Sequence, residues 1–246
     1  MKNILTLWDI DGNLVDIYRY HTPAYQKAFK KVYKTELSSS EIEENYGKPQ
    51  KDVIAIPLRN KGIDAETIQN GFPSMVSEYA KQFEHNLKQA SKDSNIVLPG
   101  VASLLQKLKS KNIPMGVVTG NIKKVGESIL DIAGLYDYFD PRINSYGDGI
   151  SHRYELVSKA INSAKKLGLV NFKTKIYVFG DVPADVESAR KTGCISVAVI
   201  KNSHDSGSSK AGKSYSRRKK LLEAAKPDYL FDDYTDLEKI ISVLNF

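Results

Sequence analysis

Apolar and polar positions recur at two different spacings along this chain. Residues 4–7 (ILTL) are apolar enough for a strand buried on both faces. Apolar positions then recur at helical spacing as far as residue 94, and from residue 95 short apolar runs alternate with amphipathic helical stretches. The later runs expected to form strands are residues 113–119, 175–179, 195–200 and 229–231. This alternation predicts an α/β fold built on a doubly wound parallel sheet.

Proline, glycine and capping residues divide the helical stretches. The helices expected before residue 95 are one over residues 20–33 with Pro23 in its first turn, one after the caps at residues 38–41, one over residues 52–58 limited by Pro57, and two that start at Asp64 and Pro73. The helices expected after residue 95 cover residues 101–108, 123–133, 154–167, 186–191 and 236–244.

The order of these elements predicts two domains. A helical block, residues 17–94, separates the first strand from the rest of the sheet, so the simplest topology is a small α-helical cap inserted into an α/β core of residues 1–16 and 95–246. In open α/β sheets, ligands bind beyond the carboxyl ends of the strands. Asp9, Thr119 and Asp181 each stand at or just after such an end, so we expect these side chains to converge on one place.

Two aspartates, Asp9 and Asp11, stand directly after the first strand and are followed by Gly12. Residues two apart in an extended chain point to the same side. Two carboxylates that face one spot repel each other unless a cation lies between them or one of them holds a proton. An ordinary Asp-Gly turn at a strand end explains the pair equally well when the pair is taken alone.

Two further carboxylates, Asp181 and Asp185, stand at the end of a later strand, and Pro183 is expected to open the helix that follows. A negative charge is favoured in the first turn of a helix, where Asp185 would lie. Four aspartates around one crevice require a divalent cation for stability. A ligand set made only of oxygens, completed by water, is how Mg²⁺ is usually bound.

A hydroxyl and a cation complete the expected site. Thr119 is followed by Gly120 and Asn121, whose backbone N–H groups at the start of a loop suit the oxygens of a phosphoryl group. A basic residue such as Arg153 can offset the anionic charge. Carboxylate nucleophile, metal, phosphoryl contacts and counter-charge are the components of phosphoryl transfer through an aspartyl-phosphate.

These segments resemble three motifs of the haloacid dehalogenase-like superfamily, most of whose members are Mg²⁺-dependent phosphatases. They are residues 9–14 (DIDGNL) for the first motif, residues 117–121 (VVTGN) for the second and residues 180–185 (GDVPAD) for the fourth. Order and spacing match over nearly the whole chain, and a helical cap between the first two motifs is similar to that of phosphoglycolate phosphatase-like members. Asn13 departs from the usual threonine, and its amide can make a similar local hydrogen bond. In the third motif Arg153 stands where lysine is usual, and Lys159 is the alternative cation.

The resemblance implies a role for each position. Asp9 would attack phosphorus and become the phosphoaspartate, and Asp11 would protonate the leaving oxygen and later deprotonate the hydrolytic water. Mg²⁺ would be held by the Asp9 carboxylate, the Asp11 backbone carbonyl and Asp181, with Asp185 in support. The residues expected to contact substrate are Gly12, Thr119, Gly120, Asn121, Arg153 and His21.

Two other activities occur in this superfamily. A dehalogenase lacks the second aspartate of the first motif, so Asp11 argues against that reaction. A β-phosphoglucomutase is the main alternative, because Tyr20, His21 and Tyr25 resemble the start of its cap. Gln50, however, stands where the mutase carries an arginine for its second phosphate, so a hydrolase is preferred. His21 is interpreted either as a cap residue near the substrate or as plain helix surface.

Composition restricts the remaining alternatives. A chain of 246 residues that is 41% hydrophobic can bury a core together with an inserted domain. Its one cysteine, Cys194, excludes an internal disulfide. The apolar run before Asp9 is too short for a signal sequence or a membrane span, so we expect a cytoplasmic protein without membrane contact.

The net charge of +7 is concentrated in residues 201–226, where eight basic side chains oppose two acidic ones. Such an excess raises the alternative of a nucleic-acid- or polyanion-binding protein. Tyr215 is the one aromatic residue in this segment, so the segment lacks a platform for stacking bases. We favour a mobile loop that attracts anionic substrates, or a solvated disordered insert, over nucleic-acid binding.

The sequence therefore predicts a Mg²⁺-dependent phosphatase whose partner is a small phosphorylated metabolite of the phosphoglycolate or sugar-phosphate type. Four cap residues are the candidates for its specificity: His21, Tyr25, Lys48 and Lys51. The oligomeric state stays open.

Overall fold

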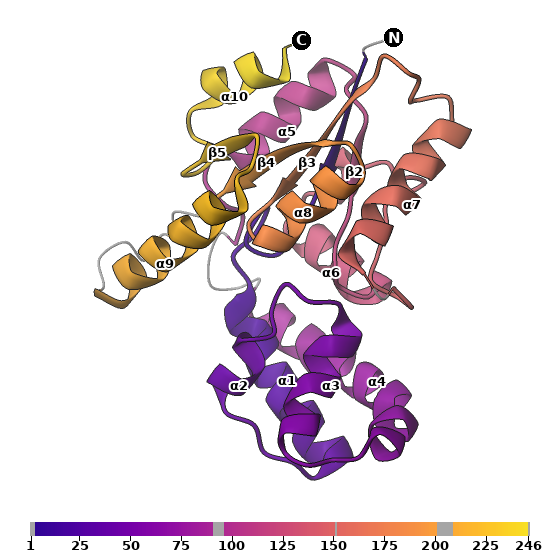
Figure 1. The fold of residues 1–246 in the computed structure, drawn as a ribbon, viewed down its shortest axis with the longest axis vertical. Helices are drawn as coiled ribbons and strands as arrows, with labels where there is room; N and C mark the ends of the chain where they lie inside the picture. Colours follow the sequence, from indigo (N-terminus) through magenta and orange to yellow (C-terminus); the bar gives the residue numbers. More distant parts are fainter. Residues whose placement is uncertain (1–2, 91–95, 151, 201–208, 246) are drawn as a thin grey trace.

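The structure is a computed structural model that describes residues 3–90, 96–150, 152–200 and 209–245 (Figure 1). Its described strands form one parallel sheet in the order β2-β1-β3-β4-β5. They are β1 (Ile4–Trp8), β2 (Met115–Val117), β3 (Lys175–Gly180), β4 (Ile195–Val199) and β5 (Tyr229–Phe231). The prediction of an α/β doubly wound parallel sheet is confirmed.

The strand order creates a switch point between β1 and β3. From β1 the chain continues to β2 on one side, and after β2 it returns past β1 and builds β3, β4 and β5 on the other side. The connections that leave β1 and β3 therefore run in opposite directions, which opens a crevice at the carboxyl ends of these two strands. Trp8 pairs with Phe179 in the β1–β3 register, so the residues that follow both strands emerge at the same level.

Helices cover both faces of the sheet (Figure 1). One face packs against α5 (Val101–Ser110), α6 (Lys123–Ile132) and α10 (Leu237–Leu244), and the other packs against α7 (Arg153–Lys166) and α8 (Pro183–Lys191). All five residues of β1 are buried, as an apolar strand covered on both sides requires. A single 3-10 turn, η1 (Tyr136–Tyr138), lies between α6 and α7.

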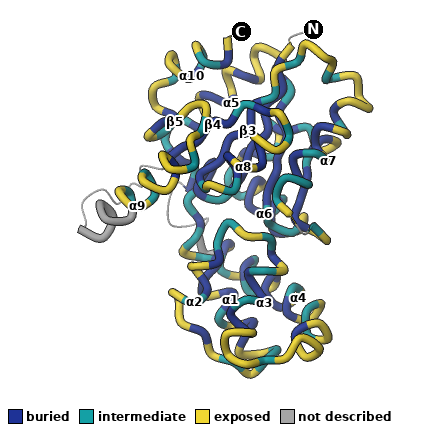
Figure 2. Tube along the Cα trace, viewed as in Figure 1, coloured by how far each residue is buried: buried dark blue, intermediate teal, exposed yellow. Residues whose placement is uncertain are grey.

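Four helices form a separate bundle next to the carboxyl ends of the strands (Figure 1). They are α1 (Tyr18–Tyr33), α2 (Ser39–Glu43), α3 (Gln50–Asn60) and α4 (Ala65–Ala90). Their buried residues face one another and the sheet, whereas the far end of the bundle is mostly exposed (Figure 2). Ser38 caps α2 through a capping box with Glu41, and Asp64 Oδ1 accepts a hydrogen bond from the Thr67 N–H at the start of α4, as the sequence predicts.

The predicted effects of three prolines are wrong. Pro23 is the sixth residue of α1 and not part of its first turn, α3 continues past Pro57, and Pro73 lies inside α4 and starts no helix. A proline within a helix removes one backbone hydrogen bond and strains the preceding turn. In α4 the apolar stripe continues beyond Pro73 through Tyr79 and Phe83, and burial of that stripe against α1 outweighs the lost bond.

The basic segment also differs from the prediction of a mobile or disordered insert. Ser209–Ala225 forms a helix, α9, while residues 201–208 lie outside the described residues. Leu222 explains the helix, because its side chain is fully buried in a cluster with Val186, Ala198 and Ile200. The many basic residues of this segment make its composition polar, so the buried contact of Leu222 could not be predicted from composition.

Candidate active site

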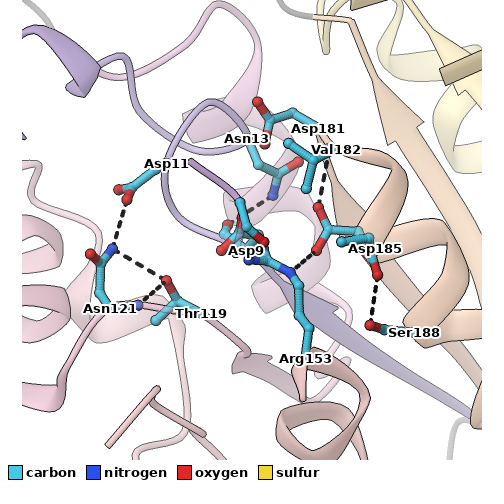
Figure 3. A network of polar contacts seen from close by, with 12 residues as sticks. Asp9, Asp11, Asn13, Thr119, Asn121, Arg153, Asp181, Val182, Asp185 and Ser188 are labelled. Atoms are coloured by element: carbon cyan, nitrogen blue, oxygen red, sulfur yellow. Dashed lines mark hydrogen bonds and ion pairs between the residues drawn. The ribbon is translucent and has the colours of Figure 1, made fainter. Parts of the chain in front are cut away.

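The polar residues that follow β1 and β3 meet in the crevice at the switch point (Figure 3). The Asp9 N–H donates to the Phe179 carbonyl at 2.9 Å, so the strand pairing continues up to the first aspartate. The backbone then turns, because the N–H groups of Leu14 and Val15 both donate to the Ile10 carbonyl. The turn points the Asp9 carboxylate into the crevice.

Three buried carboxylates form the centre of the site. Asp9, Asp181 and Asp185 each offer one oxygen, and these oxygens all lie within 4.8 Å of one another. The close approach depends on Gly12, which has a φ of 77° and where a Cβ would lie 2.1 Å from Asp181 Oδ2. Gly180 serves Asp185 in the same way, since a Cβ there would lie 2.1 Å from Asp185 Oδ2.

Arg153 is the cation that the structure brings to this cluster. It is the first residue of α7 and its side chain is only 10% exposed. Its Nε donates to Asp185 Oδ1 at 2.6 Å, and its Nη2 forms an ion pair with Asp9 Oδ2. Lys159, the alternative from the sequence, is exposed further along α7 and does not line the site.

One guanidinium does not balance three buried carboxylates. Burial raises the pKa of Asp9 well above its ordinary value, Arg153 opposes this rise, and the charges of Asp185 and Asp181 add to it. The chemistry of the donor set therefore fits a bound divalent cation, because the ligands are hard oxygens, closely spaced and in excess of negative charge. Among the described residues, this cluster could hold a metal ion.

Asp11 lies apart from the cluster. Its carboxylate is directed away from Asp9 and accepts a hydrogen bond from Asn121 Nδ2 at 2.8 Å (Figure 3). Asp9 and Asp11 line the same cavity, as expected, but Asp11 is not part of the carboxylate cluster. His21 Nε2 lies 3.3 Å from the same Asp11 oxygen. Asp11 is thus held between Asn121 and the helix α1.

The Asp11 backbone carbonyl has a partner that the sequence pattern did not predict. The Tyr18 hydroxyl donates to this carbonyl at 3.0 Å and lies 3.5 Å from Asp181 Oδ2. Burial raises the pKa of Tyr18 well above its ordinary value, so the phenol stays protonated and able to donate. A signal was present in the sequence, because Tyr18 and His21 are three residues apart on a helix and share a face.

The second motif provides the opposite wall. Thr119 is buried, and its Oγ1 accepts from both the backbone N–H and the side-chain Nδ2 of Asn121, each at 3.3 Å. Gly120 lies close to the Arg153 guanidinium, since a Cβ there would be 3.5 Å from Nη1. The fifth residue of the first motif, Asn13, donates from Nδ2 to the Asp9 carbonyl at 2.9 Å, which is the local hydrogen bond expected of it.

A cavity of about 50 Å³ lies between these residues and the helical bundle α1–α4. The core contributes Asp9, Asp11, Thr119, Gly120, Asn121 and Arg153, and the cap side contributes Tyr18, His21, Tyr25, Tyr46, Gly47, Lys48, Gln50, Val53 and Tyr79. Of the four cap residues predicted to set specificity, the structure brings His21, Tyr25 and Lys48 to the cavity but not Lys51, which is exposed.

His21 is a buried residue and not helix surface, so that interpretation is wrong. Its Nδ1 and the Tyr79 hydroxyl are 2.6 Å apart, and its ring stacks on Phe83 with centroids 4.2 Å apart. Both partners come from α4, far along the chain. The single sequence held no signal for these contacts, because they depend on how α4 packs against α1.

A family model described as haloacid dehalogenase-like hydrolase matches residues 6–199, well over half of the chain. The chain belongs to the haloacid dehalogenase-like hydrolase family. The predicted resemblance is therefore confirmed, and so is the prediction that the protein is an enzyme of the hydrolase class. No helix in the described ranges has both the length and the apolar composition needed to cross a membrane.

Three relatives illustrate the similarity. Pyrophosphatase PpaX of Oceanobacillus iheyensis is 24% identical over 237 residues, which cover 96% of this chain and 95% of the relative. The phosphoglycolate phosphatase of Aquifex aeolicus is 23% identical over 187 residues, covering 76% and 80%. The crystal structure of a β-phosphoglucomutase from Clostridium difficile has a TM-score of 0.72 at 21% identity and covers 98% of this chain and 96% of its own, which establishes a shared fold.

Proposed function

We propose that this protein is a Mg²⁺-dependent phosphatase that hydrolyses small phosphate monoesters through a phosphoaspartate on Asp9. The observation that carries the proposal is the buried cluster of Asp9, Asp181 and Asp185 with Arg153 as its counter-charge, at a small cavity that Asp9 and Arg153 line. The names of the relatives, a pyrophosphatase and a phosphoglycolate phosphatase, support phosphate release as the reaction. We further propose that residues 17–94 act as the cap over a core of residues 1–16 and 95–246.

Asp9 and Asp181 would hold Mg²⁺ together with the Asp11 carbonyl, and Asp185 would support them. Bound there, Mg²⁺ would supply positive charge that neutralises the carboxylates and polarises the phosphoryl group. The Tyr18 hydroxyl, which donates to the Asp11 carbonyl, would orient that ligand.

The residues around Asp9 suit nucleophilic attack on phosphorus. An unprotonated Asp9 oxygen would attack, and the bond from phosphorus to the leaving oxygen would break. Thr119 Oγ1, the Gly120 backbone N–H and the Arg153 guanidinium would hold the phosphoryl oxygens, on which negative charge is spread in the transition state. These donors are fixed in advance, because Thr119 is buried and Arg153 is paired with Asp185.

Asp11 would transfer the proton. Its separation from the acidic cluster suits a group that must hold a proton for the leaving oxygen and later accept one from the attacking water. The hydrogen bond from Asn121 and the contact with His21 both involve Oδ2, so the other oxygen, Oδ1, is left to face the substrate. We assign Asn121 and His21 as positioning residues for this step.

A β-phosphoglucomutase-like activity is the second candidate, and the contact of the cap residue His21 with Asp11 is the observation that favours it. A mutase must bind a second phosphate on the cap side. Gln50 and an ammonium of Lys48 that is bonded to Asn45 Oδ1 form a poor site for that dianion. Hydrolysis is therefore the preferred proposal, with phosphoglycolate- or sugar-phosphate-type esters as substrates.

The test is a phosphate-release assay on a panel of phosphomonoesters that includes p-nitrophenyl phosphate, run with Mg²⁺ and with EDTA. We expect release only with Mg²⁺, abolished in Asp9→Asn and slowed in Asp11→Asn. No metal-dependent release from any ester would overturn the proposal. Interconversion of hexose 1- and 6-phosphates without net phosphate release would favour the mutase instead. Retention on DNA that survives Asp9→Asn and falls steeply with salt would indicate a nucleic-acid-binding role for the basic segment.

A further inference from the structure

Gln50 presents an unused amide to the active-site cavity. It is the first residue of α3, directly after Pro49, and its side chain lines the cavity while only 4% of the residue is exposed. In the described part of the chain, neither its Oε1 nor its Nε2 has a hydrogen-bond partner. A buried primary amide with no partner lowers the stability of the free protein, so its presence calls for an explanation.

Three other polar groups of the cap wall already have partners. The Tyr79 hydroxyl pairs with His21, the Tyr46 hydroxyl lies 2.7 Å from Thr22 Oγ1, and the Lys48 ammonium donates to Asn45 Oδ1. Gln50 differs from all of them in that both ends of its side chain remain available. A ligand bound to this amide would therefore remove no existing hydrogen bond.

Asp11 Oδ1 is another unpaired group at the same cavity. Asp11 Oδ1 is buried and has no hydrogen-bond partner among the described residues, and it belongs to the carboxyl proposed to protonate the leaving oxygen. The two unpaired groups therefore flank the alcohol part of a bound ester. Asp11 would meet the oxygen that leaves phosphorus, and Gln50 would meet the remainder of the alcohol on the cap side.

The chemistry of the amide selects among alcohols. A primary amide is uncharged and offers donors from Nε2 and an acceptor at Oε1, which is complementary to a hydroxyl group that both donates and accepts. A carboxylate or a second phosphate only accepts at neutral pH, so it would leave Oε1 unpaired and facing negative charge. Lys48, which lines the cavity on the cap side, cannot compensate without giving up its bond to Asn45.

We propose that Gln50 is a specificity-determining residue that binds an uncharged hydroxyl of the leaving alcohol, so that the substrate is the phosphate ester of a polyol or sugar. This inference rests on the proposed phosphatase function and narrows its substrate class. It favours the sugar-phosphate type over phosphoglycolate, whose leaving group carries a carboxylate, and over bisphosphates.

The experiment compares esters matched in carbon number. Purified protein with Mg²⁺ is assayed for kcat/KM on glycerol 3-phosphate against n-propyl phosphate and on erythritol 4-phosphate against n-butyl phosphate, with 2-phosphoglycolate and p-nitrophenyl phosphate alongside. A site built to bind a hydroxyl discriminates strongly against the analogue that lacks it, so we expect a preference of about 100-fold or more in at least one matched pair. We also expect 2-phosphoglycolate to rank below the preferred hydroxylated ester.

Gln50→Met keeps the length of the side chain and removes the amide. We expect it to reduce the preference within the matched pair to below about tenfold. The melting temperature of the substrate-free protein should stay the same or rise, whereas a merely structural role would lower it. Gln69→Met, the same substitution at an exposed position of α4, is the control and should retain the preference.

The outcomes separate the two proposals. Absence of phosphate release from every ester overturns the proposed function and this inference with it. Release from p-nitrophenyl phosphate with no preference in either matched pair, a preference for 2-phosphoglycolate, or a preference that survives Gln50→Met overturns the role of Gln50 and leaves the phosphatase in place.

Discussion

Arg153→Met tests whether the acidic cluster depends on a single protein cation. The substitution keeps an apolar stem in the space that α7 provides but removes the guanidinium that contacts Asp9 and Asp185. Asp9, Asp181 and Asp185 would then lie buried, with oxygens within 4.8 Å of one another, and Asp9 and Asp185 would lose their guanidinium partner. Stability should therefore fall before catalysis is considered.

The expected loss can be worked out from this geometry. Removing one partner of a buried ion pair costs about 3–5 kcal/mol, because the remaining charge stays buried and unpaired. Arg153 is only 10% exposed and has two such partners, so the upper half of that range applies when the metal is removed by EDTA. Mg²⁺ at a concentration near 100 times Kd should raise the free energy of unfolding of the variant by about 2.7 kcal/mol relative to the same variant in EDTA.

The pH dependence has a definite sign. Arg153 opposes the raised pKa of Asp9, so its removal raises that pKa further. The folded variant then holds the proton at pH values where the unfolded chain has released it. Stability gained from that proton is present at low pH and lost as pH rises through the folded pKa. The deficit of Arg153→Met in EDTA should therefore be larger near pH 8 than near pH 5.

The assay is urea unfolding of wild type and variant in EDTA and in Mg²⁺, followed by circular dichroism at both pH values. Arg142→Met is the matched control, because Arg142 also forms a two-point pair, with Asp140, but is 65% exposed. We expect this control to lose less than about 1 kcal/mol under every condition. An Arg153→Met protein as stable in EDTA as the control would refute the dependence of the acidic cluster on Arg153.

Three further predictions concern backbone and cap. Gly12→Ala puts a Cβ 2.1 Å from Asp181 Oδ2 at a φ of 77°, so it should lose about 1–2 kcal/mol in urea unfolding together with Mg²⁺-dependent phosphate release; wild-type values for both would contradict this. Asp64→Ala removes the N-cap of α4 and should lower the free energy of unfolding by about 0.5–2 kcal/mol while phosphate release continues. An unchanged urea midpoint would show that the Asp64 N-cap contributes no stability. Hydrogen bonds from Lys61 and Ser38 lower the pKa of Glu41 from 4.5 to about 2. Glu41→Gln should therefore be less stable than wild type near pH 7 and indistinguishable near pH 2, and a difference that does not change with pH would argue against the linkage.

Most of the fold could be predicted because its signals are local. Buried strands of β-branched and apolar residues, the capping box at Ser38 and the Asp64 cap depend on a few neighbouring residues. The wrong predictions concern helices whose extent depends on packing against segments far away in the sequence. Pro73 sits inside α4 because the apolar stripe is buried against α1, and α9 forms because one leucine, Leu222, is buried against the core.

The candidate site shows the same division. Asp9, Thr119 and Asp181 could be placed together from the sequence, because parallel strands bring their carboxyl ends to one edge. The directions in which these side chains point could not be predicted from the sequence. The strand pattern did not indicate that Asp11 would accept a hydrogen bond from Asn121, and the contact of Asp11 with His21 depends on how α1 packs over that edge.

Several buried polar groups without a full set of partners lie at the active-site cavity, and ligand binding explains why they are there. The raised pKa of Asp9, the unpaired Asp11 Oδ1 and the unpaired Gln50 amide each lower the stability of the free protein. Groups of this kind persist where a ligand supplies the missing partner, since function and stability compete at active sites. A cation would satisfy Asp9, and an ester would satisfy Asp11 and Gln50 at once. Substitution of Gln50 by an apolar residue should therefore stabilise the empty enzyme and weaken it as a catalyst, a combination that a residue needed only for folding would not produce.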